Sequence, residues 1–172
     1  LGETVLAAVK RVRANVAWQP NRPVRLVFHS FKPFRGSYVN QIRQLLSGLK
    51  DDGFSVQCAF VHIAERHPLL IFDPDQEQRI ATRGKAVWLS DYDALVSVVG
   101  PDEVRRDGLG FPSPLCLHVH RDSTFKDMKY IARQVVAFSA HSWRNFSPTS
   151  LPVTLLYAEL IAKLLGRLGN LS

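Results

Sequence analysis

Acidic side chains at strand ends could hold catalytic metal ions, and this sequence offers few of them. Hydrolysis of a phosphodiester by two metal ions requires several converging carboxylates, because Mg²⁺ prefers hard oxygen ligands. The expected central strand, residues 24–30, contains no acid, and Phe31 and Lys32 follow it. Glu3 and Glu159 lie in expected helices at opposite ends of the chain. The residues alone therefore do not predict a nuclease centre.

The histidines and the remaining motifs do not predict a catalytic or metal site either. His118 and His120 are two residues apart on an expected strand and so share a face, but no cysteine or carboxylate lies at zinc-finger or HExxH spacing from them. The run His120-Arg121-Asp122 is similar to a kinase catalytic loop, yet it lacks the downstream asparagine and a preceding glycine-rich loop. No GxSxG motif is present. We expect strand-end histidines whose ring nitrogens are satisfied by neighbours, and no bound metal.

The basic residues give the first indication of what the chain binds. The chain has 22 Lys+Arg against 15 Asp+Glu and a formal net charge of +7. This balance favours polyanions as partners, with nucleic acid first among them. Two basic regions could contact phosphates in a salt-dependent way, and their alternative interpretation is a solvated helix face. The first is a stripe at the start of one expected helix and the second lies nearer the C-terminus: Arg121, Lys126, Lys129 and Arg133; Arg144, Lys163 and Arg167.

Composition bounds the class of protein. A length of 172 residues corresponds to about one domain, and 46% hydrophobic residues exclude a mainly disordered chain. No apolar run is long enough to span a membrane. Cys58 and Cys116 both lie within apolar, strand-like runs. We therefore expect reduced, buried thiols in a cytoplasmic protein that does not bind membranes.

The hydrophobic pattern predicts an α/β fold built around one mixed sheet. Residues 90–98 are expected to form a short helix capped by Ser90, and residues 100–114 a loop. Thr124 and Asp127 have the spacing of a capping box. The longer expected helices are 3–17, 39–49, 125–138 and 152–168, and the expected strands are 24–29, 54–63, 69–72, 86–89 and 115–119.

Four blocks of sequence carry a sharper indication. They are RLVFHSFKPF (25–34), CAFVHIAERHPLLIFDP (58–74), RGKAVWLS (83–90) and PLCLHVHRDSTFKDMKYIARQVVAFSAHSWRNFSPTSLPVTLLYAELIAKLL (114–165). Their order and spacing resemble the Piwi domain of prokaryotic Argonautes. The most specific part is SWRNFSP followed by LPVTLLYAELIA, which resembles the closing segment of that domain.

The resemblance implies an RNase H-like fold in which residues 1–172 form the C-terminal part of a Piwi domain. The Mid domain and the first Piwi strand, which carries the first catalytic aspartate, have no counterpart in the sequence. Of the catalytic tetrad, Glu159 and Glu3 match as remnants, whereas the third acid is replaced around Phe31. This departure resembles the short, catalytically inactive Argonautes. The implied function is guide-directed binding of nucleic acid, without nuclease activity, in defence against plasmids or phages.

The resemblance also implies residues and partners. Arg144, Ser150 and Tyr157 match the segment that contacts the guide backbone, and Lys163 is a further candidate. The implied partners are a guide of RNA or DNA, its target, and an effector protein that could contact residues 100–114. No cofactor is expected in this chain, and Mg²⁺ is implied only for guide 5′-phosphate binding in the full-length protein. The alternative function is a divalent-metal-dependent guided endonuclease whose remaining acids lie outside this chain.

Overall fold

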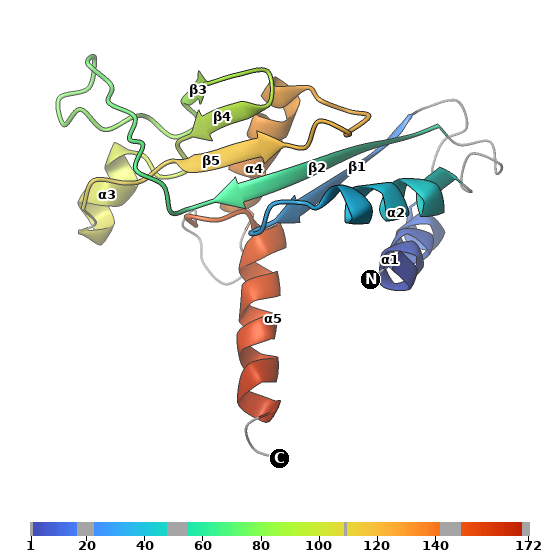
Figure 1. Cartoon of the computed structure of the whole chain (residues 1–172). Coiled ribbons are helices and arrows are strands. Elements are labelled where there is room, and N and C mark those ends of the chain that lie inside the picture. The colour runs from blue at the N-terminus through green and yellow to red at the C-terminus, as the bar shows by residue number, and fades with distance from the viewer. Residues whose placement is uncertain (1, 17–22, 48–54, 109, 142–148, 170–172) are drawn as a thin grey trace. The chain divides into compact units, whose positions relative to one another are not determined.

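The computed structural model describes residues 2–16, 23–47, 55–108, 110–141 and 149–169 (Figure 1). A five-stranded mixed sheet has the order β1-β2-β5-β4-β3, as expected for an α/β chain, but residues 24–30, expected as its central strand, form the edge strand β1 of the described sheet. The chain divides into two compact units, residues 1–62 with 119–126 and residues 63–118 with 127–172. None of the described helices has both the length and the apolar composition needed to cross a membrane. The elements are α1 (Gly2–Asn15), β1 (Val24–Ser30), α2 (Gly36–Ser47), β2 (Val56–Ala64), β3 (Ala86–Trp88), β4 (Asp93–Val96), α3 (Pro101–Asp107), β5 (Leu115–Val119), α4 (Met128–Ala140) and α5 (Val153–Gly169).

The first unit packs two helices against two parallel strands. β1 and β2 pair in register from Val24 opposite Val56 to Ser30 opposite His62. Alternate apolar side chains of both strands meet α1 and α2 in one core, in which Phe28 stacks on Phe60 with ring centroids 5.2 Å apart. α1 and α2 lie side by side in Figure 1. This packing fixes the carboxyl end of β1 relative to the beginning of α2.

Residues 120–125 extend the first unit along β2. The hydroxyl of Ser123 accepts a hydrogen bond from the Phe60 N–H at 3.0 Å, and that of Thr124 accepts one from the Cys58 N–H at 2.7 Å. The Thr124 hydroxyl is therefore hydrogen-bonded to the backbone of β2. It does not cap α4, as the sequence suggested, because the carboxylate of Asp127 accepts from the Tyr130 N–H and caps that helix.

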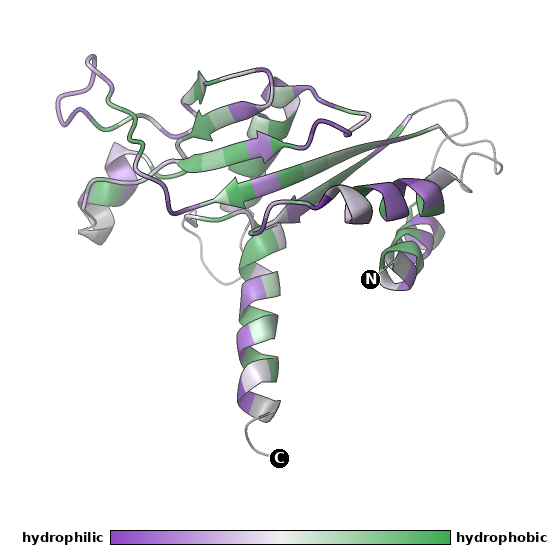
Figure 2. Cartoon of the chain, viewed as in Figure 1, coloured by the Kyte–Doolittle hydropathy of each residue, from purple (hydrophilic) through white to green (hydrophobic). Residues whose placement is uncertain are grey.

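In the second unit, both faces of the sheet are buried. Ala94 and Val96 of β4 lie opposite Leu117 and Leu115 of β5, and all four are buried on one face. α4 contacts β4, and its buried residues supply the other half of that core. On the opposite face, Leu95 packs with Ile71 and Ala81. Figure 2 shows the resulting hydrophobic colouring of β4 and β5.

Residues 93–96 form a strand, so the prediction of a helix after Ser90 was wrong. A tight turn joins β3 to β4: the N–H groups of Leu89 and Ser90 both donate to the carbonyl of Asp93. The apolar run that follows consists of residues suited to a strand buried on both faces, which periodicity alone does not separate from a helix.

Two further expectations require correction. Residues 101–107 form the helix α3 within the expected loop, and Glu103 accepts a hydrogen bond from the Gly100 N–H at 2.9 Å while Gly108, at φ 61°, ends the helix. Residues 69–72 form no strand; Phe72 makes a single bridge to Ile80.

Both cysteines are free, as expected; Cys58 is buried, whereas Cys116, which was also expected to be buried, is only half-buried. Burial raises the pKa of the Cys58 thiol to about 11, despite the nearby charge of Arg43. Burial also raises the pKa of Cys116, and the neighbouring Asp93 carboxylate adds to that increase.

Candidate nucleic-acid interface

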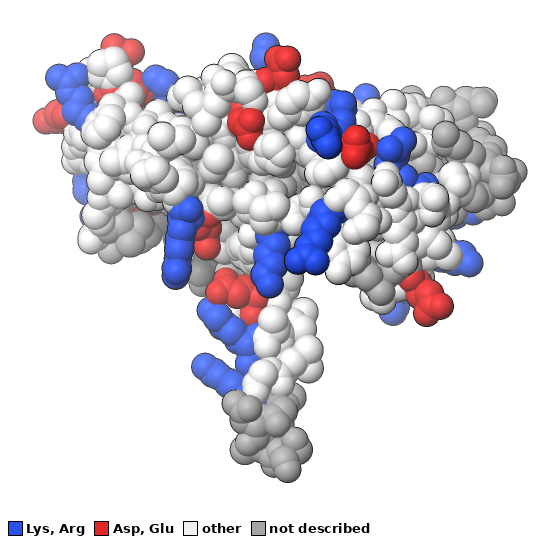
Figure 3. All heavy atoms as spheres, in the orientation of Figure 1, with Lys and Arg blue, Asp and Glu red and all other residues white. Residues whose placement is uncertain are grey.

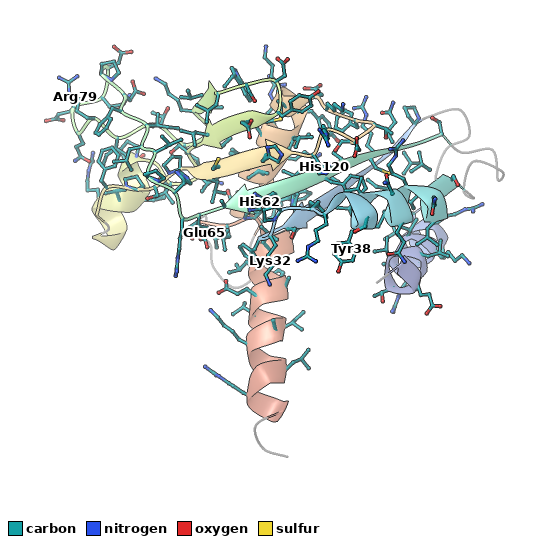
Figure 4. All side chains as sticks on the ribbon, viewed as in Figure 1. Lys32, Tyr38, His62, Glu65, Arg79 and His120 are labelled. Atoms are coloured by element: carbon teal, nitrogen blue, oxygen red, sulfur yellow. The ribbon has the colours of Figure 1, made fainter. Side chains whose placement is uncertain are left out.

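A cavity of about 800 Å³ lies beside the carboxyl end of β1 in the first unit. Apolar side chains, among them Phe28 and Phe34, form part of its lining. The hydroxyl of Ser30 accepts a hydrogen bond from the Lys32 N–H at 3.0 Å, which turns the chain as it leaves the strand. The remaining polar side chains that line the cavity are His29, Lys32, Arg35 and Tyr38. Figure 4 labels Lys32, which lies between β1 and α2, and Tyr38, which lies in the first turn of α2.

The electrostatics of the β1 cavity favour an anion. Lys32 and Arg35 are exposed at its rim, and none of the described residues that line it carries a carboxylate. Burial lowers the pKa of His29 to about 4, so its ring is neutral at physiological pH. Mg²⁺ prefers carboxylate oxygens and would be repelled by two cations. The lining therefore does not fit a metal ion, whereas it fits a phosphate group.

The two acids expected as remnants of a catalytic tetrad do not form a metal site in the described residues. Glu3 is exposed on the first turn of α1 and does not line the β1 cavity. Glu159 on α5 pairs with Lys163 one turn later, with Oε1 and Nζ 2.6 Å apart. Burial raises the pKa of Glu65, and the nearby charge of Glu159 raises it further. The charges of Arg66 and Lys163 lower this pKa but do not cancel the increase. The described chain contains no group of three His, Cys, Asp or Glu side chains that could hold a metal.

The predicted basic stripe divides at the beginning of α4. Arg121 and Lys126 precede the helix, which begins at Met128, so the stripe does not run along one helix as expected. Lys129 and Arg133 do lie on α4, one turn apart, and both line a groove of about 480 Å³ together with Trp88 of β3. Sequence reasoning missed Trp88, and it also missed Arg35 beside Lys32.

The residues implied by the resemblance lie at the beginning of α5 and before it. Arg144 falls outside the described residues. Ser150 is exposed and Tyr157 is partly buried. Thr149 fixes this segment, because its N–H donates to the carbonyl of Ser139 at the end of α4 at 2.8 Å and its hydroxyl donates to the carbonyl of Leu151 at 2.6 Å. Figure 3 shows that charged side chains gather along one side of α5.

Five histidines have a ring nitrogen within hydrogen-bonding distance of a neighbour, as expected, whereas the buried Nε2 of His29 makes no hydrogen bond to the described residues. Nε2 of His62 donates to the carbonyl of Phe31 at 3.1 Å, and Nε2 of His67 donates to that of Pro114 at 2.7 Å. Nδ1 of His118 lies 2.6 Å from Oδ1 of Asp93, whereas Nδ1 of His120 accepts from a backbone N–H two residues later. These rings support the backbone at strand ends.

Comparison with known proteins connects these features to one family. No protein-family model matches the sequence. The chain is 31% identical over 182 residues to "Protein argonaute" of Cereibacter sphaeroides, a match that covers 98% of this chain and 23% of that protein. It is 26% identical over 123 residues to a "Piwi protein" of Archaeoglobus fulgidus, covering 67% of this chain and 29% of that protein. The chain thus spans less than a third of the length of either relative.

Solved structures show the same fold. Clostridium butyricum Argonaute, bound to a guide DNA and a 19-mer target DNA, superposes with a TM-score of 0.65 at 19% identity over 95% of this chain and 20% of that one. A. aeolicus Argonaute superposes with a TM-score of 0.63 at 12% identity over 92% of this chain and 20% of that one. The C-terminal lobe of a budding yeast Argonaute superposes with a TM-score of 0.61 at 10% identity, over 95% of this chain and 36% of that one. The chain is a Piwi-like segment, with an RNase H-like fold, of the kind found in prokaryotic Argonautes.

Proposed function

We propose that this chain is part of a nuclease-inactive Argonaute that holds a guide and its target through their phosphate backbones. The observation that carries the proposal is the carboxyl end of β1. Ser30, Phe31 and Lys32 occupy the positions at which the resemblance implies a catalytic acid. The cavity beside them presents Lys32 and Arg35 and has no carboxylate in its lining.

The charges at this cavity explain why binding would replace cleavage. An arginine donates two parallel hydrogen bonds to a phosphate, and a lysine adds a point charge. The same two cations oppose the binding of Mg²⁺, on which two-metal hydrolysis depends. Lys32 and Arg35 would thus hold a backbone phosphate where an active enzyme would hold metal ions.

The second set of contacts lies around α5. We place the guide backbone against Arg144, Ser150, Tyr157 and Lys163, the residues that the resemblance implies. Lys163 is paired with Glu159 at the surface. An exposed pair of this kind contributes only ~0–1 kcal/mol, so a phosphate can compete for the lysine. Such a protein would act in the cytoplasm, in defence against invading nucleic acid, together with an effector subunit.

The binding test compares two double variants of equal charge. Lys32→Ala with Arg35→Ala should weaken binding of a labelled guide–target duplex about tenfold or more, measured by fluorescence anisotropy, because charged hydrogen bonds to phosphate are lost. Lys10→Ala with Arg11→Ala removes the same charge from exposed positions on α1 and should change the affinity less than twofold. Equal losses in the two variants would show that only net charge matters and would contradict the proposed site.

The cleavage test addresses the alternative function. The duplex should remain intact after incubation with the protein and Mg²⁺ or Mn²⁺, assayed by denaturing gel. A guided cut that disappears in Glu159→Ala would establish a metal-dependent endonuclease and overturn the proposal.

A further inference from the structure

The groove between β3 and α4 in the second unit, here called the Trp88 groove, has a composition that the cavity at β1 lacks. It has a volume of about 480 Å³ and joins an aromatic ring to two cations, Lys129 and Arg133. Trp88 keeps 45% of its surface exposed. Because Ala86 and Trp88 are two residues apart on a strand, they share one face, and both line the groove together with residues of α4.

Among the described residues, no acidic side chain compensates the charges of Lys129 and Arg133 in the groove. Lys129 and Arg133 are exposed on successive turns of α4, so their side chains lie on the same face, about 5–6 Å apart at Cβ. Within the part of the chain that the structure describes, neither forms an ion pair, and no carboxylate lines the groove. A site of this kind attracts an anion.

Small residues and a fixed backbone keep the Trp88 groove open. Gly84 and Ala132 contribute to its lining without filling it. Gly84 has φ 84°, a conformation that suits glycine. The preceding residue, Arg83, donates from Nη2 to the carbonyl of Val136 at 2.8 Å, which ties this wall of the groove to α4. The groove is therefore formed before any ligand binds.

We infer that the Trp88 groove binds an unpaired nucleotide of a single-stranded nucleic acid. The base stacks on the indole of Trp88, and Lys129 and Arg133 contact the adjoining phosphates. Aromatic stacking between basic side chains is the usual way to hold single strands without sequence preference. A protein partner fits less well, because charged residues are depleted at the centres of protein interfaces. The inference does not depend on the proposed function, since the β1 cavity uses other residues.

The test uses the 172-residue chain with Trp18→Phe and Trp143→Phe, which leaves Trp88 as its only tryptophan. A short oligothymidylate should quench the fluorescence of Trp88, and a fully paired duplex should quench it much less. Fluorescence anisotropy of the labelled oligothymidylate, titrated with the unsubstituted chain, measures the affinity without the two Trp→Phe substitutions. Thermal melts of every variant confirm that each one is folded.

Three variants separate stacking from charge. Trp88→Ala should lower the affinity for oligothymidylate about tenfold or more, whereas Trp88→Phe should retain most of it. Lys129→Gln with Arg133→Gln should lower the affinity and reduce the salt slope by about 2. The matched control, Arg66→Gln with Arg105→Gln, removes the same charge from exposed positions outside the groove and should leave both quantities nearly unchanged.

Several results would overturn the inference. Unchanged binding in Trp88→Ala would exclude stacking, and equal losses in the charge variant and its control would reduce the effect to net charge. Equal quenching by polyglutamate would assign the groove to an acidic peptide. Lys32→Ala with Arg35→Ala should leave the quenching of Trp88 intact, so failure of the proposed function and failure of this inference give different results.

Discussion

At the scale of single residues, the carboxylate of Asp93 illustrates how the turn between β3 and β4 is held. Its Oδ1 lies 2.6 Å from Nδ1 of His118, its cross-strand neighbour, and its Oδ2 accepts from the hydroxyl of Ser90 at 2.6 Å. Burial alone would raise the pKa of Asp93, but the hydrogen bonds from Ser90 and His118 outweigh it and lower the pKa below its usual value. The charged form of this side chain therefore stabilises the folded state.

Asp93→Asn should lower the free energy of unfolding at neutral pH by about 1 kcal/mol, because a hydrogen-bonded charge is lost. A pKa that is lower in the folded state contributes stability above the unfolded value, ~3.9, and this contribution is lost as the pH falls through the folded value. Urea unfolding of the two proteins should therefore differ at pH 7 and converge below about pH 4. Asp91→Asn, in the same turn and exposed, is the matched control and should have little effect. A constant difference at all pH values would contradict this account.

Single residues also show what the sequence could predict of the sites. The sequence already showed that no acid follows β1, because Phe31 and Lys32 stand there. Arg35 was not assigned to the same place, because only the turn made by Ser30 brings it to the cavity. Trp88 lay in an expected strand, but its face could not be chosen before the partner strand β4 was known.

At the scale of elements, Arg83 connects three segments of the second unit. Its Nη1 donates to the carbonyl of Val98 at 2.7 Å, and its Nη2 donates to the carbonyl of Val136 and to the hydroxyl of Ser139 at 2.8 and 2.7 Å. Val98 follows β4, whereas Val136 and Ser139 belong to α4. One planar guanidinium thus joins the end of a strand to the helix that covers it.

Arg83→Ala should lower the free energy of unfolding by about 2–3 kcal/mol, because three acceptors lose a charged donor. Arg83→Lys should recover only part of this loss, since an ammonium cannot reproduce the geometry of the fork. Arg105→Ala, on the exposed side of α3, should cost less than about 0.5 kcal/mol. The measurement is chemical denaturation of all three variants, and a full recovery by lysine would show that charge alone is needed.

The elements that were predicted incorrectly share one physical cause. The residues of β4 are apolar in succession, so their pattern fits a helix as well as a strand, and the pairing of Trp88 with Ala94 decides between them. The helix α3 is too short to show a helical periodicity in its sequence. Its beginning is marked instead by the hydrogen bond that the Gly100 N–H donates to the carboxylate of Glu103. In contrast, α2 and α4 follow the helical spacing of their buried residues and were predicted closely.

At the scale of the whole molecule, the excess of seven positive charges belongs to the first unit, which has 11 Lys+Arg against 4 Asp+Glu, whereas the second unit has 11 of each. Lys32 and Arg35 belong to the first unit, whereas Lys129, Arg133 and Lys163 belong to the second. Each unit therefore carries cations that a phosphate backbone could contact. The net charge predicted a polyanion as partner, but not the separate groups of exposed cations in the two units.

The affinity for a guide–target duplex should depend strongly on salt. Four phosphate contacts give a slope of about −3.6 for log affinity against log salt, or a loss of about a hundredfold between about 50 and 200 mM. Anisotropy titrations over this range measure the slope, and Lys32→Ala with Arg35→Ala should reduce it by about 2. An affinity that does not change with salt would show that the duplex is held by apolar contacts.

The raised pKa values of the two native thiols have a practical consequence for such experiments. The thiolate is the form of cysteine that reacts with electrophiles. With a pKa of about 11 for Cys58 and a raised value for Cys116, very little thiolate is present in either position at neutral pH. A cysteine introduced at an exposed position will therefore react with a maleimide dye well before the native pair, and site-specific labelling requires no prior removal of Cys58 or Cys116.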